Sequence, residues 1–220
     1  MMKKLQVLLI AGVATGALMA ASAQAAPLIN YELTTDEGNT VTGTALFEFE
    51  DNVAPPPDIF LNLLVSNTSA DQSMITAIVF DLPDGEYVDF SFDDTNGWTA
   101  ATGQGPLAGF DVCIATTGPT CTGGDPNNGV EAGTSLLFGF SFNSTLSASE
   151  FEALTVAGYN DGSLRSTTRF QRVGPDGEDS AFAPGTPGNG TPVPEPATLA
   201  LLGIGLLGAG YMARRRRDDV

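Results

Sequence analysis

The chain contains no histidine among its 220 residues. Imidazole is the usual general base near neutral pH, and both the Ser-His-Asp and the Cys-His arrangements depend on it. Hydrolases of these two classes are therefore excluded. A zinc site is disfavoured as well, because two cysteine thiolates would need two further ligands. Residues 26–191 can bury a substantial apolar core unaided, so we predict no cofactor and neither catalytic nor metal-ligating residues.

Basic residues are also scarce, with nine lysines and arginines against 26 aspartates and glutamates. Two of the nine are Lys3 and Lys4, and four lie together at residues 214–217. The region between keeps three arginines against twenty-three acids, so its formal charge is 3 − 23 = −20. Such a region repels polyanions, which excludes nucleic acid as a partner. The charge favours a soluble monomer, and it leaves calcium or a cationic polymer open as a partner.

The first apolar run has the pattern of a secretory signal peptide. Met1–Lys4 supply positive charge, Leu5–Leu18 form the apolar segment, and Ala23 and Ala25 give the small-residue pattern that signal peptidase accepts. The run is too short to be a permanent membrane span. We therefore predict that residues 1–25 are a signal peptide, cleaved after Ala25, and that the rest of the chain is exported.

Only two cysteines are present, and they flank the Gly/Thr/Pro turn Ile114–Thr120. The spacing of Cys113 and Cys121 excludes a CxxC redox pair. Because an exported chain leaves the reducing cytosol, we predict a disulfide between them. Closing so short a loop removes unfolded-state entropy worth about 2.5 kcal/mol.

A second apolar run, Ala197–Ala213, carries no charge and is followed by four consecutive arginines, Arg214, Arg215, Arg216 and Arg217. As a helix the run spans roughly 25 Å, enough for a thin bilayer. Each arginine at the membrane centre costs about 2.5 to 3.5 kcal/mol, so the cluster stops transfer and stays on the cytoplasmic side. We therefore predict one transmembrane helix over residues 197–213, with the preceding domain facing outward.

The order of these parts resembles a known sorting signal. Val193, Pro194, Glu195 and Pro196, then the apolar helix, then the arginines, are similar to the PEP-CTERM signal of Gram-negative bacteria that make exopolysaccharide. The resemblance covers residues 193–218 and implies that an exosortase processes an inner-membrane intermediate, with the domain then moving to the cell surface or extracellular matrix. It makes Pro194, Glu195 and Pro196 recognition residues. The alternative is an ordinary single-span anchor that keeps the domain on the inner membrane.

Period-two alternation of apolar residues dominates the middle of the chain and is typical of half-buried strands. Short runs of this kind, separated by turn residues, predict a mainly β fold, an antiparallel β-sandwich over residues 26–173, with a barrel as the alternative. Only Ala148–Ala153 indicates a helix, with Ser149 as its cap and Glu152 as the capping acid. The Gly/Pro-rich residues 174–192 predict a flexible linker. The expected strand segments are Val41–Phe49, Ile59–Val65, Met74–Phe80, Tyr87–Phe92, Phe110–Ile114, Phe138–Phe142, Leu154–Tyr159 and Leu164–Val173.

The body of the chain also resembles a group of PEP-CTERM surface proteins called the cistern family. The resemblance rests on Phe110–Cys113, Cys121–Gly124, Gly129–Gly133 and Arg169–Gln171. That group has no assigned activity, so the resemblance supports the fold and implies no reaction.

The residues of the middle region bear on three kinds of chemistry. A carboxylate pair can hydrolyse glycosides, but acids are too abundant here for their proximity in sequence to indicate one. Asp89, Asp93, Asp94 and Asn96 crowd one turn and could coordinate calcium, although the EF-hand template fails there. Trp98, with Tyr87, could stack on sugar rings, or could build the core. We expect a non-enzymatic surface or matrix protein associated with exopolysaccharide, the alternatives being a carbohydrate- or calcium-binding module and a polysaccharide hydrolase.

Overall fold

The computed structural model describes residues 26–52, 58–92, 97–100, 107–116, 120–121 and 124–188. These residues form an 11-stranded sheet, the helix α1 (Ala148–Asp161) and the short 3-10 helix η2 (Pro126–Asn128). The strands in chain order are β1 (Leu28–Thr34), β2 (Thr40–Asp51), β3 (Asp58–Asn67), β4 (Met74–Phe80), β5 (Tyr87–Phe92), β6 (Trp98–Ala100), β7 (Val112–Thr116), β8 (Val130–Glu131), β9 (Ser135–Ser144), β10 (Ser166–Val173) and β11 (Asp179–Pro187).

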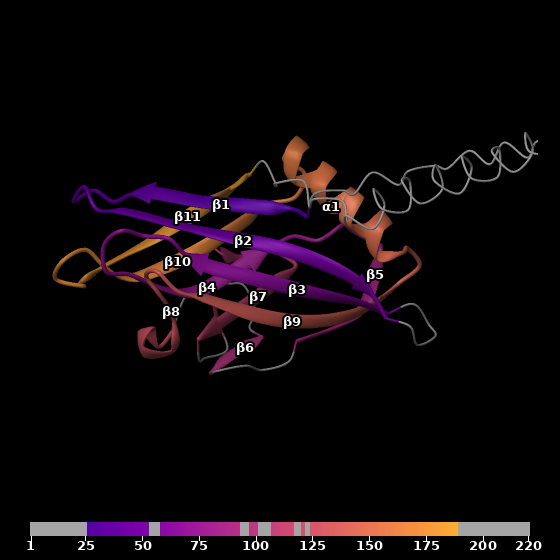
Figure 1. Cartoon of the computed structure of the whole chain (residues 1–220), viewed down its shortest axis with the longest axis horizontal. Helices are drawn as coiled ribbons and strands as arrows, with labels where there is room; N and C mark the ends of the chain where they lie inside the picture. The colour runs from indigo at the N-terminus through magenta and orange to yellow at the C-terminus, as the bar shows by residue number, and fades with distance from the viewer. Residues whose placement is uncertain are drawn as a thin grey trace, which may run out of the picture.

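All the strands join one antiparallel sheet in the order β5-β9-β3-β2-β1-β11-β10-β4-β7-β6, with β8 paired to β4. The sheet curls over itself, so that β1, β2, β3 and β9 form a front layer and β10, β4 and β7 lie behind them (Figure 1). The predicted mainly β, antiparallel fold is confirmed. The two separate sheets of a sandwich are not found, because β11 pairs with both β1 and β10 and makes the layers continuous.

The inner faces of the two layers pack against each other through aromatic rings. Phe47 of β2 meets Phe80 of β4 edge-on, with ring centroids 5.3 Å apart. Phe138 of β9 lies 4.8 Å from the ring of Trp98 in β6. The residues that alternation predicted to face inward are all buried, which confirms the register of β2 and β9: Val41, Ala45, Phe47, Phe49, Phe138, Phe140 and Phe142.

The remaining predicted strands have mixed outcomes. The predictions Met74–Phe80 and Tyr87–Phe92 coincide with β4 and β5, and three others overlap β3, β7 and β10. The strand predicted over Leu154–Tyr159 is wrong, because this segment belongs to α1. Its buried residues Phe151, Thr155 and Tyr159 recur every four positions, so a helix is the conformation that places them on one face.

The cap of α1 also lies two residues before the predicted one. Ser147 Oγ accepts a hydrogen bond from Glu150 N at 3.4 Å, and Glu150 Oε2 accepts one from Ser147 N at 2.9 Å, which is a complete capping box. The predicted pair, Ser149 with Glu152, has the same spacing two residues further on. The earlier pair forms because Ala148 N also donates to the Asp51 carboxylate at 2.6 Å, which fixes the first turn against β2.

The flexible linker predicted for residues 174–192 is wrong over residues 179–187, which form β11. Ala181 and Ala183 of this strand are buried in the core. Gly185 lets β1 approach closely, since a Cβ there would lie 2.5 Å from Ile29 Cγ2 and 3.1 Å from Tyr31 Cε1. Small residues therefore mark a tightly packed strand here, and the domain extends beyond residue 173.

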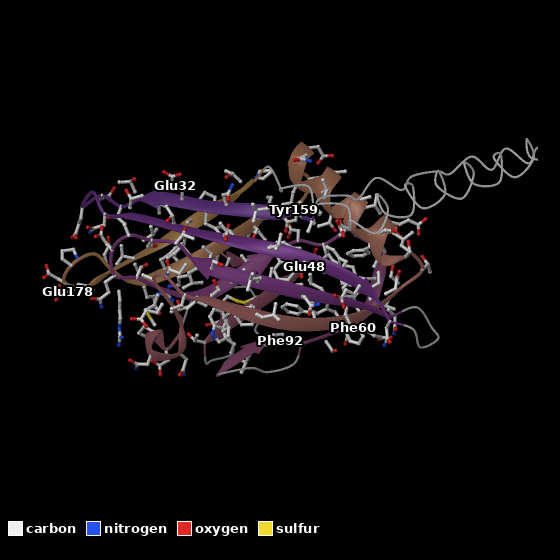
Figure 2. The ribbon with its side chains drawn as sticks, viewed as in Figure 1. Glu32, Glu48, Phe60, Phe92, Tyr159 and Glu178 are labelled. Carbon is white, nitrogen blue, oxygen red and sulfur yellow. A yellow bond between two sulfur atoms is a disulfide. The ribbon has the colours of Figure 1, made fainter. Side chains whose placement is uncertain are left out.

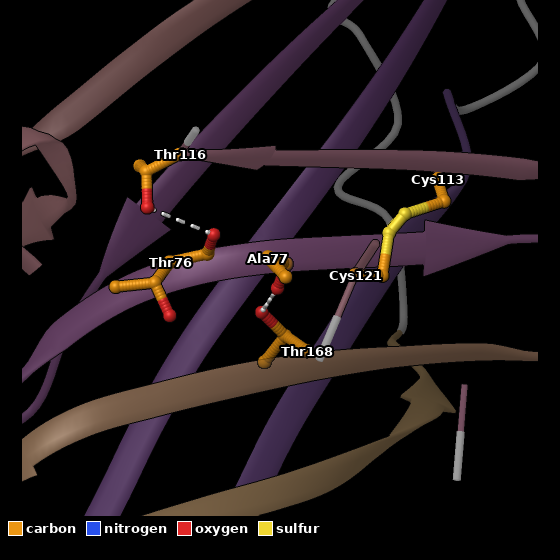
Figure 3. The surroundings of a disulfide bond; sticks show 6 residues. All are labelled: Thr76, Ala77, Cys113, Thr116, Cys121 and Thr168. Carbon is orange, nitrogen blue, oxygen red and sulfur yellow. Dashed lines mark hydrogen bonds between the residues drawn. A yellow bond between two sulfur atoms is a disulfide. The ribbon is translucent and has the colours of Figure 1, made fainter. Parts of the chain in front are cut away.

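A disulfide covers the outer face of the rear layer (Figure 3). Cys113 and Cys121 are bonded, as predicted, with Cα atoms 6.3 Å apart, which lies within the usual range. They pack with Leu107 against Ala77 and Val79 on the outward side of β4. This second apolar cluster explains why β4 is buried on both faces.

Two threonine hydroxyls hold β4 to its neighbours beside the disulfide (Figure 3). Thr168 Oγ1 donates to Ala77 O at 2.9 Å, and Thr116 Oγ1 donates to Thr76 O at 3.4 Å. Because all four residues lie on adjacent strands of the rear layer, these bonds add to the backbone ladder around β4.

Candidate functional site

The aromatic residues considered for sugar stacking lie inward. Trp98 is fully buried, and its Nε1 donates to Asn128 O at 2.9 Å. Tyr87 is half-buried against Phe142 and Phe151. Burial, followed by the negative charge of Asp111 and other nearby carboxylates, raises the pKa of Tyr87 to about 12. Trp98 is thus a core residue, and it cannot stack on a sugar in this structure.

The acidic turn considered for calcium is described only in part. Asp93, Asp94 and Asn96 lie outside the described residues. The carboxylate of Asp89 accepts a hydrogen bond from Asn143 Nδ2 at 3.1 Å. No group of three or more His, Cys, Asp or Glu side chains that could hold a metal ion occurs within the described ranges.

Exposed apolar side chains gather on the outer surface of the front layer. Phe60 and Leu64 of β3 are 41% and 37% exposed, and Leu137 of β9 is 53% exposed. The register places Leu64 opposite Leu137 and Phe60 opposite Ser141. Directly opposed residues share a face of the sheet with Cβ atoms about 5 Å apart. These side chains therefore form one surface across two strands.

A glycine opens the middle of this surface. Gly139 lies between Leu137 and Ser141 along β9 and opposite Asn62 of β3. A Cβ built at Gly139 would meet nothing within 4 Å, so the position is open to solvent. Ser141 Oγ is hydrogen-bonded to Ser91 Oγ of β5 at 2.7 Å. We call this set the outer patch: Phe60, Asn62, Leu64, Leu137, Gly139 and Ser141.

A row of leucines extends the outer patch toward the end of the described chain. Leu64 lies opposite Leu46 of β2, and Leu46 lies opposite Leu28 of β1. Next to this row, Gly188 N donates to Leu28 O at 2.6 Å. The described part of the chain therefore ends beside the leucine row.

Acidic residues border the outer patch on its β2 side. Glu48 lies opposite Asn62 and Glu50 opposite Phe60, and both glutamates are exposed. Figure 2 labels Glu48 and Phe60 on the layer nearer the viewer. Burial first, and the Glu48 carboxylate second, raise the pKa of Glu152 on α1. The acids on this side of the domain therefore repel one another.

No basic residue of the described strands offsets these acids on the front layer. The segment from residue 26 to residue 191 has no lysine, and its three arginines all belong to the rear layer or to the turn that enters it. Arg165 pairs with Asp81, Arg169 lies over the Phe182 ring, and Arg172 donates to Asn127 Oδ1 at 2.8 Å. The outer patch thus lies in a negative field.

A polar cluster around the buried Asp81 has a structural role. Asp81 Oδ2 accepts hydrogen bonds from Arg165 N at 3.0 Å and Nε at 3.4 Å, and Tyr159 OH donates to Asp81 O at 3.1 Å. Burial raises the pKa of Asp81, against the opposing effect of Arg165. These groups bind one another and hold α1 to the ends of β4 and β10.

The predicted sorting residues all lie outside the described residues. Among the residues that are described, no helix is long and apolar enough to cross a membrane. The predictions that the structure leaves undescribed are the cleavage residues Ala23 and Ala25, the motif Val193, Pro194, Glu195 and Pro196, the span over residues 197–213 and the stop-transfer cluster Arg214, Arg215, Arg216 and Arg217.

Comparison with known families identifies the tail. A family model for the PEP-CTERM protein-sorting motif matches residues 192–217. The chain carries a PEP-CTERM sorting signal. This finding confirms the resemblance assigned to residues 193–218, whereas the resemblance of residues 110–171 to the cistern family stays a prediction. No curated protein and no solved structure matches the chain.

A PEP-CTERM signal marks an exported protein of the Gram-negative cell envelope or surface that an exosortase processes. The matched residues begin four positions after Gly188, the last described residue, and end at Arg217, so they include the whole arginine cluster. The match includes no residue of the β domain. The match therefore says nothing of what the β domain binds.

The sequence contains a signal for the outer patch that period-two alternation alone does not reveal. Ile59–Val65 is apolar at every position except Asn62, so Phe60 and Leu64 face one side of the sheet while Leu61 and Leu63 face the other. A strand with one solvated face normally alternates with polar residues. A strand that is apolar on both faces therefore indicates either burial on both sides, as in β4, or an exposed apolar surface, as in β3.

Proposed function

We propose that this protein is a non-enzymatic component of the cell surface or extracellular matrix, which an exosortase processes and which associates with exopolysaccharide. The PEP-CTERM signal at residues 192–217 is the observation that carries the proposal, since it marks an exported chain that an exosortase processes. Signal peptidase and exosortase are then the processing partners. The membrane holds the chain only before processing.

Two features of the domain suit this location. The Cys113–Cys121 disulfide is stable in an oxidising compartment. The high negative charge keeps separate copies apart and soluble in a crowded matrix. Association with polysaccharide is supported by the outer patch, which combines an exposed ring with amide and hydroxyl groups.

Mass spectrometry of the mature protein tests the processing. We expect the protein from producing cells to lack the four arginines at residues 214–217, and the same chain from cells without exosortase to retain them. Replacing Pro194, Glu195 and Pro196 by alanine should give the unprocessed mass, whereas alanine at Thr191 should not. A mature protein that keeps its arginines in the presence of exosortase contradicts the proposal.

Fractionation tests the association with exopolysaccharide. We expect the processed protein to sediment with the polysaccharide matrix of producing cells and to become soluble when polysaccharide synthesis is abolished. An unchanged distribution argues against the association. The non-enzymatic part of the proposal is tested separately, because release of reducing sugar from the isolated matrix by the purified protein would identify a hydrolase instead.

A further inference from the structure

We infer that the outer patch, together with Glu48 and Glu50, binds an amino-sugar polysaccharide, in which protonated amino groups meet the glutamates and the apolar faces of the sugar rings cover Phe60. This inference rests on the proposed association with exopolysaccharide and specifies its chemistry.

The apolar part of the patch has the shape of a platform. Phe60, Leu64 and Leu137 present exposed side chains on neighbouring strands, and Gly139 leaves free space between them. Asn62 and Ser141 lie within the same surface and supply amide and hydroxyl groups to fix the orientation of a ring. An aromatic face with a few polar groups beside it is suited to a ligand that is apolar on one side and hydroxylated at its edge.

The charge around the platform selects a cationic ligand. Glu48 and Glu50 border it, Glu152 has its pKa raised in part by Glu48, and no basic residue lies on the described strands of the front layer. A protonated amine relieves this repulsion and is also attracted by the face of the Phe60 ring. A uronic acid polymer, by contrast, meets an uncompensated negative field.

The same charge argues against a second copy of the chain as the occupant. Two outer patches brought face to face would place the glutamates of one domain near those of the other, and each domain already carries a net charge of −20 (3 − 23). Like charges in apposition suppress such contacts. We therefore do not expect the outer patch to bind a second copy, and the experiment below includes a test for self-association.

A titration of the full-length chain, held in a non-ionic detergent without a sugar headgroup, tests the inference. The probes are glucosamine hexamer, N-acetylglucosamine hexamer and cellohexaose, at low salt and at a pH where the free amines are protonated. We expect glucosamine hexamer to bind most tightly and its affinity to fall as salt is added, because exposed charges are screened within about 10 Å at 0.1 M.

Four variants assign the binding to the outer patch. We expect Phe60→Ala to weaken binding roughly two- to tenfold, the range of an aromatic contact. The double variant Glu48→Gln/Glu50→Gln should weaken it to a similar extent and remove most of the salt dependence. The controls are Leu154→Ala, which removes a comparably exposed apolar side chain on α1, and Glu178→Gln, in the distant turn between β10 and β11 (Figure 2). Both controls should bind like the unmodified protein.

Each outcome supports or overturns the inference. Equal binding of all three hexamers, no binding of glucosamine hexamer, or normal binding by the double variant would overturn it. Sedimentation that shows dimers, abolished by Phe60→Ala, would make the outer patch an interface between copies and would also overturn it. If glucosamine hexamer fails but the protein still sediments with the native matrix, the proposed function stands and only the amino-sugar assignment is lost.

Discussion

The loss of stability on removing the Cys113–Cys121 disulfide can be estimated from the length of the loop that it closes. Cys113 and Cys121 are eight positions apart, and closing a loop of this length lowers the unfolded-state entropy by an amount worth about 2.5 kcal/mol. For a domain of this size each kcal/mol shifts Tm by roughly 2–4 °C. We therefore expect Cys113→Ala/Cys121→Ala to unfold about 5–10 °C lower than the unmodified protein.

Fluorescence gives a direct assay, because Trp98 is the only tryptophan, is fully buried and lies on β6 beside β7, the strand that carries Cys113. Unfolding exposes its ring and shifts its emission to longer wavelength. The unmodified protein treated with a reductant serves as the matched comparison, since it loses the bond while keeping both sulfur atoms in the apolar cluster. The same reductant should leave the alanine variant unchanged. Equal stability of the oxidised and reduced proteins would refute the entropic argument.

Three further predictions concern α1 and the tether, by which we mean residues 189–193 between the β domain and the Pro-Glu-Pro motif. Hydrogen bonds from Ser147 lower the pKa of Glu150, so the stability that this carboxylate contributes is present above its ordinary pKa and is lost as the pH falls through the lowered value. In thermal melts, Glu150→Gln should therefore reduce Tm at pH 7, and this reduction should shrink steadily as the solution is acidified. Tyr159→Phe removes the bond to Asp81 O and should lower the free energy of unfolding by about 1 kcal/mol in urea titrations, with an unchanged value contradicting the role given to that hydroxyl. Because only residues 189–193 separate Gly188 from Pro194, inserting about ten flexible Gly and Ser residues after Gly188 should make the motif more accessible and speed exosortase processing in pulse-chase labelling. A slower rate would mean that the enzyme recognises the domain as well as the motif.

Alternation predicted most of the sheet because the front layer has a simple pattern on its inner face. In β9, Phe138, Phe140 and Phe142 point into the core and leave Gly139 and Ser141 outside, as expected. The outward face could not be predicted in the same way, since nothing local distinguishes an exposed Leu137 from a buried one. That distinction depends on which strands lie next to β9 and whether anything covers them.

The strand β11, predicted as a linker, shows how composition can mislead. β11 contains Pro184, Gly185 and Pro187, which are typical of a linker. Proline lacks a backbone N–H donor. Because β11 pairs with β10 up to Pro184 and with β1 from Gly185 onward, few backbone N–H donors are needed where the strand changes partner. The small residues fit because β1 approaches closely there. Long-range proximity of this kind leaves no mark on the local pattern.

The position of β11 limits how the sorting signal can be used. Because the strand ends at Pro187, only residues 189–193 separate Gly188 from Pro194, and a fully extended chain of this length spans about 20 Å. An exosortase that acts at the Pro-Glu-Pro residues must therefore work within that distance of the end of β11, where this strand pairs with β1. Detachment of β11 would release its nine residues into the tether but would also separate the two layers of the sheet. We therefore expect variants that weaken the pairing of β11 with β1 to be processed faster in pulse-chase labelling and to unfold at a lower temperature in thermal melts, and an unchanged processing rate would mean that the enzyme needs no more than residues 189–193.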